Sequence, residues 1–248
     1  LYPWMDEGFT AYMEEEIMNQ LKGEGLIPGA VSVKDPHAET LADFKAFAGT
    51  ASEEPLSTHA DHYSTSRAYG IGSYVKGALC LHHIRYMVGD NAFWTGIRRY
   101  YELWKFRHPN PDDFFRIMEK ASGLELDWFK LYWVNTVKTI DYAISSVEQD
   151  GRQTVVNLER KGQFPMPVVI RVILKDGAQK DYEIPLDLMM APKNSLGTER
   201  VRQMPWHWVA AQYRLKLDFP LAEISQIQLD PSRMLADVDE SNDQWVGE

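Results

Sequence analysis

The stretch "IDYAISSVEQDGRQTVVNLERK" (residues 140–161) marks the point at which the spacing of apolar side chains changes along the chain. Apolar residues tend to alternate with polar ones on both sides of Asp150 and Gly151, a dipeptide typical of tight hairpin turns. Before this stretch the apolar period is close to 3.6 residues, which is typical of amphipathic helices. The change predicts a mostly α-helical domain over residues 1–138 and a β-sandwich domain over residues 139–248.

Strand patterns continue downstream of this hairpin. The stretch "MPVVIRVILKDGAQKDYEIPLDLM" (residues 166–189) predicts a second hairpin around another Asp-Gly turn, and residues 213–219 and 224–230 add two more strands. About six to seven short strands joined in this way predict an antiparallel β-sandwich. The sequence ends in an acidic tail, "ADVDESNDQWVGE" (residues 236–248), which we expect to be mobile unless Trp245 fixes it.

Upstream, the patterns are helical. Apolar side chains recur at three- and four-residue steps over residues 4–21, and Gly23 and Gly25 follow as helix-ending residues. Residues 26–72 have few strong periods and predict short helices and loops. Four further stretches combine helical periodicity with capping residues: "GSYVKGALCLHHIRYMVGD" (72–90), "DNAFWTGIRRYYELWKF" (90–106), "NPDDFFRIMEKASG" (110–123) and "LDWFKLYWVNT" (126–136).

Composition excludes several classes of function. The net charge is −10 and no cluster of Lys and Arg interrupts it, which argues against a nucleic-acid-binding protein. No apolar run is long enough to predict a membrane segment or a signal peptide. Cys80 is the single cysteine, so no internal disulfide can form, and we expect it to be a small buried apolar residue. It does not decide the compartment.

Two residues are candidates for chemistry. Glu7 is a carboxylate near the start of a helix, where it either interacts with the helix dipole or serves as a metal ligand on a rigid element. Tyr74 follows a glycine-rich stretch at the predicted entry of a helix. There it either donates a hydrogen bond to an oxyanion in a neighbouring cleft or packs beneath the loop.

Histidines offer weaker candidates for a metal site. His59 and His62 are three residues apart and can meet on one helical turn, although loop or capping contacts explain them as well. His82 and His83 are adjacent and therefore point in different directions, so at most one of them faces any single site.

The remaining polar candidates favour structural roles. We expect Glu14, Glu15 and Glu16 to form a solvated helix face. Asp6 is either a helix cap or a partner of Glu7, and Arg67 is a candidate contact to substrate or ligand carboxylates. In the predicted sandwich no group of residues suggests chemistry, and the aromatic "PWHW" is expected to serve packing.

Taken together, several segments resemble the M1 family of zinc aminopeptidases over roughly residues 3–137. The segments that carry the resemblance are "WMDEGFTAYMEE" (4–15), "SYVKGALCLHHIRYMVGDNAFWTGIRRYYELWKF" (73–106) and "HPNPDDFFRIMEKASGLELDWFKLYWVNT" (108–136). Stretches of the second half, "LERKGQFPMPVVIRV" (158–172), "PWHW" (205–208) and "QLDPSRMLADVDESND" (228–243), resemble the β-sandwich that follows the catalytic domain in bacterial members. The resemblance implies the helical C-terminal part of a thermolysin-like (gluzincin) catalytic domain followed by a sandwich.

The resemblance assigns roles to two residues. Glu7 matches the third zinc ligand, and Tyr74 matches the residue that stabilises the tetrahedral intermediate. The family's other two ligands are histidines of an H-E-x-x-H motif about nineteen residues before the ligand glutamate, and its Glu is the general base. This sequence contains no H-E-x-x-H. We therefore expect a C-terminal part of a longer enzyme that by itself holds no stoichiometric zinc and has no activity. Its substrate-binding residues are not identified.

The function implied for the longer protein is zinc-dependent removal of N-terminal residues from peptides, which makes it a metallo-aminopeptidase and a hydrolase. One alternative is a non-catalytic peptide- or protein-binding module that keeps the aminopeptidase shape. A further alternative is an independent docking role for the sandwich. We also expect self-association through apolar surface on the helical half. The resemblance favours an extracytoplasmic location, which no residue of the sequence decides.

Overall fold

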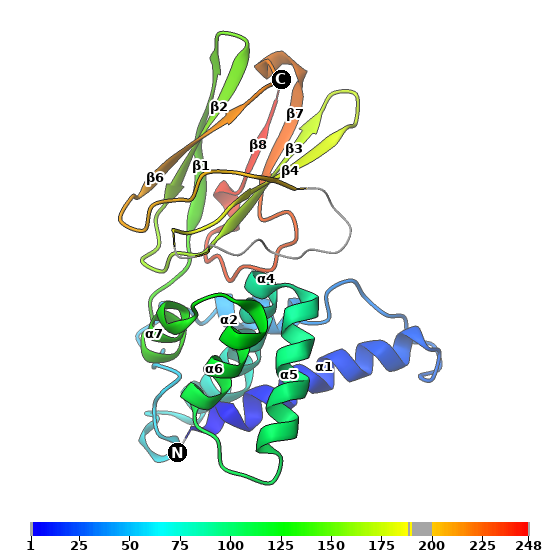
Figure 1. The fold of residues 1–248 in the computed structure, drawn as a ribbon, viewed down its shortest axis with the longest axis vertical. Coiled ribbons are helices and arrows are strands. Elements are labelled where there is room, and N and C mark those ends of the chain that lie inside the picture. Colours follow the sequence, from blue (N-terminus) through cyan, green and yellow to red (C-terminus); the bar gives the residue numbers. More distant parts are fainter. Residues whose placement is uncertain (1, 188, 190–199, 248) are drawn as a thin grey trace. The chain divides into compact units, whose positions relative to one another are not determined.

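A computed structural model describes residues 2–187, 189 and 200–247 of the chain (Figure 1). The chain divides between Val137 and Lys138 into two compact units, a helical unit and a β unit. Leu1, the first residue of the first predicted domain, and Glu248, the last residue of the second, lie outside the described residues. Leu188, near the end of the second predicted hairpin, also lies outside them.

The helical unit contains the predicted helices. Its elements are α1 (Glu7–Gly23), α2 (Ala38–Lys45), α3 (Ser66–Gly70), a π-helical segment (Ile71–Lys76), α4 (Gly77–Val88), α5 (Asp90–Trp104), α6 (Pro111–Ser122) and α7 (Asp127–Asn135). Short 3-10 turns occur at Pro3–Met5 and Ala60–His62. The predicted ends of α6 are confirmed: Asn110 and Asp113 form a reciprocal capping box, and Gly123 ends the helix with a φ of 71°.

The start of the helix around Tyr74 differs from the prediction. The helix begins at Ser66, where the Thr65 side chain accepts a hydrogen bond from the Ala68 amide at 3.0 Å, and it continues through the π-helical segment into α4. Gly72 lies inside the π-helical segment and packs against Tyr63. A glycine suits this position because a Cβ would lie 2.8 Å from the phenol oxygen. Gly70 and Gly72 therefore lie inside a helix and do not form a turn, and of these two only Gly72 packs closely against a neighbour.

Helix α4 lies in the core of the helical unit. All of its residues except Arg85 are buried, including Cys80, His82 and His83. The prediction that Cys80 is a buried apolar residue is confirmed, and burial raises the pKa of its thiol well above the ordinary value. Across the described ranges of the chain, we find no helix with the length and hydropathy needed to cross a membrane.

The β unit is the predicted sandwich. One sheet has the order β1 (Tyr142–Asp150), β2 (Gln153–Arg160), β6 (Gln212–Leu217). The other has the order β5 (Arg200–Arg202), β4 (Gln179–Ile184), β3 (Val168–Leu174), β7 (Ile224–Leu229), β8 (Gln244–Val246). Both predicted hairpins, β1–β2 and β3–β4, are present and antiparallel. The short strand β5 differs from the antiparallel prediction because it pairs with β4 in parallel.

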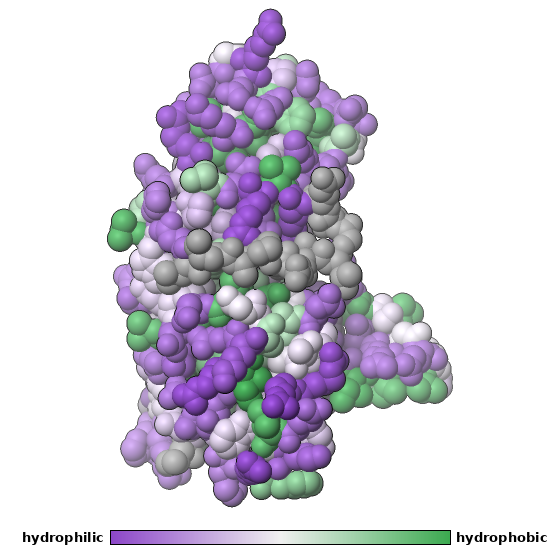
Figure 2. Space-filling view, in the orientation of Figure 1, coloured by the Kyte–Doolittle hydropathy of each residue, from purple (hydrophilic) through white to green (hydrophobic). Residues whose placement is uncertain are grey.

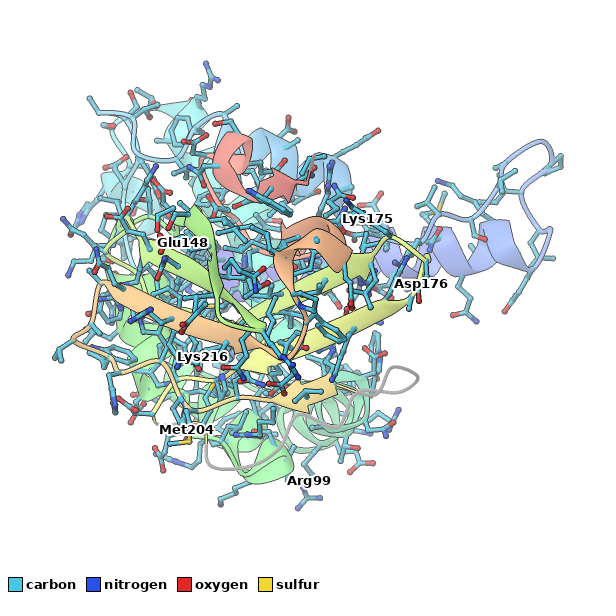
Figure 3. All side chains as sticks on the ribbon, turned by 90° about the horizontal axis from the view of Figure 1, so that it is seen from above. Arg99, Glu148, Lys175, Asp176, Met204 and Lys216 are labelled. Carbon is cyan, nitrogen blue, oxygen red and sulfur yellow. The ribbon has the colours of Figure 1, made fainter. Side chains whose placement is uncertain are left out.

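Figure 3 labels four charged residues of the β unit that are exposed: Glu148, Lys175, Asp176 and Lys216. Glu148 in β1 and Lys216 in β6 are exposed, whereas Leu215 and Leu217 beside Lys216 are buried. This alternation is the period of two that the sequence shows. It places the apolar face of each strand in the core.

The acidic tail is not a mobile appendage in its described part. The Asp237 carboxylate is buried and accepts a hydrogen bond from the Tyr142 amide at 2.8 Å. Strand β8 then adds to the sheet edge at β7, where Trp245 lies opposite Ile227. This placement agrees with the alternative that Trp245 fixes the tail, and the carboxylates add hydrogen bonds to backbone donors, which charge counting does not reveal.

Two glycines set the distance between α1 and the helix that contains Tyr74. A Cβ built on Gly8 would lie 2.6 Å from the Gly77 Cα, and one built on Gly77 would lie 2.9 Å from the Gly8 Cα. Real Cβ atoms do not approach backbone atoms this closely, so the two backbones touch where the helices cross. Glu7 precedes one of these glycines directly, and Tyr74 lies three residues before the other.

A cluster around His37 fixes the middle of α1. The His37 ring is buried and stacks on Tyr12, with 4.3 Å between ring centroids. Its Nδ1 contacts the Glu15 carboxylate, and its Nε2 lies 2.8 Å from the Glu16 Oε1. Arg85 of α4 donates a hydrogen bond to the same Glu16 oxygen at 2.5 Å. The cluster therefore ties α1 both to α4 and to the segment before α2.

The predicted solvated face of α1 is correct only for Glu14, which is exposed. Glu15 and Glu16 are half-buried in the His37 cluster, a contact that joins residues more than twenty positions apart. Beyond the cluster, the end of α1 and the following loop project from the helical unit and carry exposed apolar side chains such as Ile17 and Leu26 (Figures 1 and 2).

The contact between Gly8 and Gly77 predicts that one methyl group added at this crossing lowers the stability of the fold. We expect Gly77→Ala to destabilise the chain by about 1–3 kcal/mol, because overpacking must push two backbones apart. Gly70→Ala is the matched control: it adds the same methyl group to the preceding helix, where no atom lies within 4 Å. That control should be neutral or stabilising by up to about 1 kcal/mol, since alanine favours helices. Urea denaturation of both variants checks this, and equal stabilities would contradict the assigned crossing.

The His37 cluster predicts a pH profile. Burial alone lowers the pKa of His37, but hydrogen bonds to Glu15 and Glu16 outweigh it and raise that pKa. Its contribution is therefore complete below about pH 6.5 and is lost as the pH rises through the folded-state pKa. Burial alone raises the pKa of Glu16, but its bonds to His37 and Arg85 lower it below 4.5, so that contribution disappears as the pH falls through the lowered value.

We therefore expect the melting temperature, followed through the helical signal in circular dichroism, to be highest between about pH 4.5 and 6.5. The variant His37→Gln should flatten the decline on the alkaline side. His62→Gln removes an exposed histidine instead and should keep the wild-type profile. An unchanged alkaline decline in His37→Gln would show that another group causes it.

Candidate functional site

Glu7 is the first residue of α1. It follows the 3-10 turn Pro3–Met5, whose Trp4 is fully buried and anchors the start of the helix. The Asp6 side chain makes no capping hydrogen bond, so a capping role for Asp6 is not observed. The Glu7 carboxylate is half-buried at the positive end of the helix dipole, where a negative charge is stabilised.

Tyr74 lies in the π-helical segment Ile71–Lys76. Its side chain is 41% exposed, whereas Lys76 two residues later is 2% exposed. Positions two apart on a helix point roughly 160–200° apart, so the phenol faces outward while the lysine faces the core. Single π turns inside α-helices are rare and occur frequently at functional sites.

The fold brings Glu7 and Tyr74 together although they are 67 positions apart in the sequence. The Tyr74 hydroxyl lies close enough to the Glu7 carboxylate to interact with it, and this interaction, followed by desolvation and the negative charges of Glu7 and Asp6, raises the pKa of Tyr74. A phenol with a raised pKa keeps its proton at neutral pH. The pair therefore presents a carboxylate acceptor beside a hydroxyl that can donate a hydrogen bond.

Two further tyrosines, Tyr69 and Tyr63, pack in a row beside Tyr74. The Tyr69 ring lies edge-on to Tyr74 with 6.4 Å between centroids, and Tyr63 lies edge-on to Tyr69 at 5.6 Å. Edge-to-face contacts of this length are favourable. They support the position of the Tyr74 ring.

Lys76 is a residue that the sequence analysis missed. Its ammonium is buried, donates hydrogen bonds to Glu53 Oε1 at 2.8 Å and to the Thr136 carbonyl at 3.2 Å, and is held in the core behind Tyr74. A lysine within an otherwise apolar stretch, "SYVKGALCL", is the signal that could have identified it.

Glu7 fits the chemistry of one zinc ligand, because it is a carboxylate fixed on a rigid helix. Catalytic zinc usually takes three protein ligands. In the described parts of the chain, the one group of three such side chains close enough to share an ion is Glu119, Glu125 and Asp127, and Glu7 is not in it. These residues therefore do not assemble a complete zinc site around Glu7.

The other histidine candidates are explained by structural contacts. His59 accepts a hydrogen bond from the Asp61 amide at 3.2 Å and caps a 3-10 turn, and its ring lies 5.1 Å from that of His62. His83 lies 2.8 Å from the Leu79 carbonyl through Nδ1, and burial lowers the pKa of His83 to about 4. The His82 ring packs edge-on against His37.

Arg67 lies over the Phe47 ring at 5.7 Å from the centroid, a cation–π contact that accounts for its position. The sandwich aromatic Trp206 is buried and packs edge-on against Tyr142, which agrees with a packing role for "PWHW".

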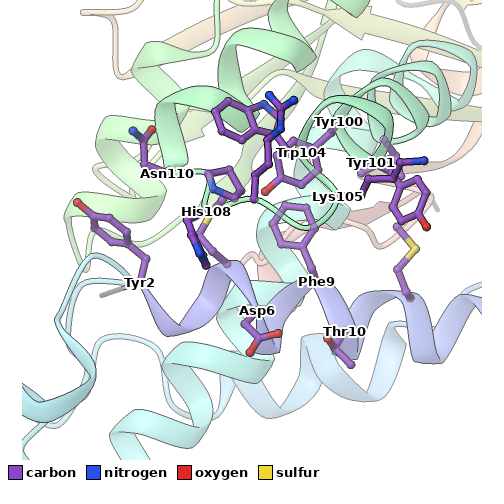
Figure 4. A pocket seen from close by; sticks show the side chains of 15 residues that line it. Tyr2, Asp6, Phe9, Thr10, Tyr100, Tyr101, Trp104, Lys105, His108 and Asn110 are labelled. Atoms are coloured by element: carbon purple, nitrogen blue, oxygen red, sulfur yellow. The ribbon is translucent and has the colours of Figure 1, made fainter.

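A wide apolar groove runs along the opposite side of α1 (Figure 4). It has a volume of about 1000 Å³ and lies between α1 and the end of α5 with the loop that follows. Its walls include Phe9, Met13, Tyr100 and Trp104, and Asp6 also lines it. Glu7 therefore lies on a helix that has Tyr74 beside one face and an uncovered apolar groove along another.

Comparisons with known proteins identify the family of the chain. The family model described as "Peptidase family M1 domain" matches residues 3–133. A "Probable aminopeptidase 1" of Sulfurisphaera tokodaii is 22% identical over 221 residues, which is 82% of this chain and 27% of that protein. "Aminopeptidase N" of Lactococcus lactis is 25% identical over 135 residues, which is 53% of this chain and 15% of that protein.

A solved structure shows the same fold. Aminopeptidase A of Legionella pneumophila, in complex with aspartic acid, superposes with a TM-score of 0.58 at 13% identity, over 95% of this chain and 24% of that one. The chain thus spans about a quarter of the length of the Sulfurisphaera and Legionella proteins. Since the family model covers more than half of the sequence, the chain belongs to peptidase family M1.

Proposed function

We propose that this chain is part of a zinc-dependent aminopeptidase that removes N-terminal residues from peptides. The observation that carries the proposal is the pairing of Glu7 with Tyr74 across the α1 crossing. The family match and the aminopeptidase relatives support the reaction class. We assign residues 1–138 to the end of the catalytic domain and residues 139–248 to a β-sandwich domain that follows it.

In this proposal Tyr74 stabilises the transition state. Attack of water on the peptide carbonyl turns its oxygen into an oxyanion, and a neutral phenol beside it can donate a hydrogen bond to that charge. Exposure leaves the Tyr74 hydroxyl accessible from solvent, and the raised pKa keeps its proton in place. The donor is fixed before the reaction, because the π-helical segment and Tyr69 hold the ring.

Glu7 is the one residue of this chain that we assign to zinc. Zinc, when bound, would polarise the peptide carbonyl and activate a water molecule. The Glu7 carboxylate would hold the ion next to the Tyr74 hydroxyl, which explains why a carboxylate and a phenol are kept in contact. The remaining ligands and the general base would come from an H-E-x-x-H motif, which this sequence does not contain.

An alternative function is a non-catalytic module that binds peptides or proteins with the same shape. The groove along α1 favours it, because an apolar surface of that size suits a partner segment. Self-association through this groove belongs to the same proposal. An intact H-E-x-x-H in the longer protein would favour the enzyme, whereas an altered one would favour the binding module.

The first test uses the 248-residue chain itself. We expect no hydrolysis of aminoacyl-anilides, because the sequence lacks the H-E-x-x-H motif that would supply two zinc ligands and the general base. Colorimetric assays with and without added zinc check this, with a known aminopeptidase as positive control. Hydrolysis that a chelator abolishes would contradict the proposed division of ligands.

The second test uses the longer protein that contains this chain. We expect Tyr74→Phe to lower kcat by roughly 10²–10³-fold with little change in KM, because it removes a hydrogen bond made in the transition state. Zinc content should stay unchanged. Tyr213→Phe, at a half-buried tyrosine of strand β6 outside the groove, is the matched control and should keep wild-type kinetics. A kcat within twofold of wild type in Tyr74→Phe would remove Tyr74 from the mechanism.

A further inference from the structure

A buried ion pair lies directly behind the segment that carries Tyr74. Lys76 and Glu53 have side chains that are each 3% exposed, and their Nζ and Oε1 atoms are 2.8 Å apart. The second Glu53 oxygen accepts a hydrogen bond from the Gly49 amide at 2.7 Å. Both charged groups are therefore paired and hydrogen-bonded, as buried charges must be.

The pair is part of a larger attachment of the π-helical segment. The Lys76 ammonium also donates to the Thr136 carbonyl at 3.2 Å and lies 5.6 Å from the ring centroids of Phe44 and Trp133. The Trp133 indole in turn donates a hydrogen bond to the Lys76 carbonyl at 3.1 Å. Lys76 is thus attached through its side chain and its backbone. Its contacts reach α2, α7 and the segment before Leu56.

The attachment acts where the helix departs from α geometry. Lys76 is the last residue of the π-helical segment, and Gly77 of the α1 crossing follows it directly. A π turn persists only where tertiary contacts hold it, because it is less favourable than the α-helix on either side. Lys76 fixes this turn from the core, while Tyr74 projects from its opposite side towards Glu7.

Stability alone does not explain a buried ion pair. Replacing such a pair by apolar residues of similar volume is often neutral or stabilising, because desolvation of both charges offsets their attraction. What an ion pair adds is geometry, since two hydrogen-bonding groups must meet at one distance and orientation. The position of this pair therefore suggests that it specifies the path of the π turn.

We propose that the buried Lys76–Glu53 pair is a positioning device that holds the π-helical segment so that the Tyr74 hydroxyl meets the reacting oxygen. The inference rests on the proposed aminopeptidase function for its catalytic consequence. Its structural part, the anchoring of Ile71–Lys76, stands without that function.

The variant Glu53→Gln/Lys76→Met tests the proposal without leaving a lone buried charge. In the longer protein we expect a loss of at least tenfold in kcat with KM within twofold, because substrate binding does not require the Tyr74 hydroxyl. In a Tyr74→Phe background the same double substitution should have no further effect on kcat, because the group it positions is already absent. Lys130→Met is the matched control: it removes another lysine that pairs with carboxylates and lies over an aromatic ring, far from the π turn in sequence.

A merely structural role gives a different result. It would lower kcat by the same factor in the wild-type and Tyr74→Phe backgrounds, and that outcome overturns the proposal. Retention of full kcat by the double variant also overturns it. The single variant Lys76→Met is the second variant. Its folded form should show the same loss of kcat as the double variant.

A measurement on the 248-residue chain separates this inference from the proposed function. Hydrogen exchange of the amides over residues 70–77 should be at least tenfold faster in the double variant, with the exchange of α5 and α6 unchanged. If the longer wild-type protein shows no peptidase activity, the proposed function fails, and this measurement still decides the anchoring. Unchanged exchange over residues 70–77 would overturn the inference even in an active enzyme.

Discussion

The contact between the backbones of Gly8 and Gly77 is the constraint on which the candidate site depends. Two helices can cross at this distance only where neither carries a side chain, so both positions must be glycine at once. Glu7 and Tyr74 lie within three residues of the crossing, so the spacing of the two helices sets how closely the carboxylate approaches the phenol. A wider crossing would keep the fold and separate the carboxylate from the phenol.

Charges on either side of the crossing determine how the two helices are oriented. On α1, the His37 cluster joins Glu15 and Glu16 to Arg85 of α4, about two to three turns beyond the glycines. On the other helix, Lys76 binds Glu53 in the core. Close contact fixes one point of a crossing but leaves rotation about it free, so hydrogen bonds away from that point are needed to define the angle.

Much of the fold follows from the sequence, because periodicity and capping act locally. The change of period after residue 139, the Asp-Gly hairpins and the capping box at Asn110 are all present as predicted. The misinterpreted features depend on distant partners: Glu15 and Glu16 need His37, the acidic tail needs Tyr142, and Gly72 needs Tyr63. Glu7 and Tyr74 were identified through family resemblance, since neither residue type indicates chemistry alone.

The same reasoning explains why Lys76 escaped notice while Tyr74 did not. A family motif draws attention to the group that faces the substrate, whereas a residue that acts from the core looks like an isolated polar exception in an apolar helix. Burying an ammonium costs desolvation free energy. A buried lysine is therefore expected where its geometry is needed, or where its removal would leave a partner charge buried and unpaired. Here the ammonium lies at the end of the π turn and opposite the phenol, which is where a fixed geometry would matter most for a hydrogen-bond donor that must be in place before the reaction.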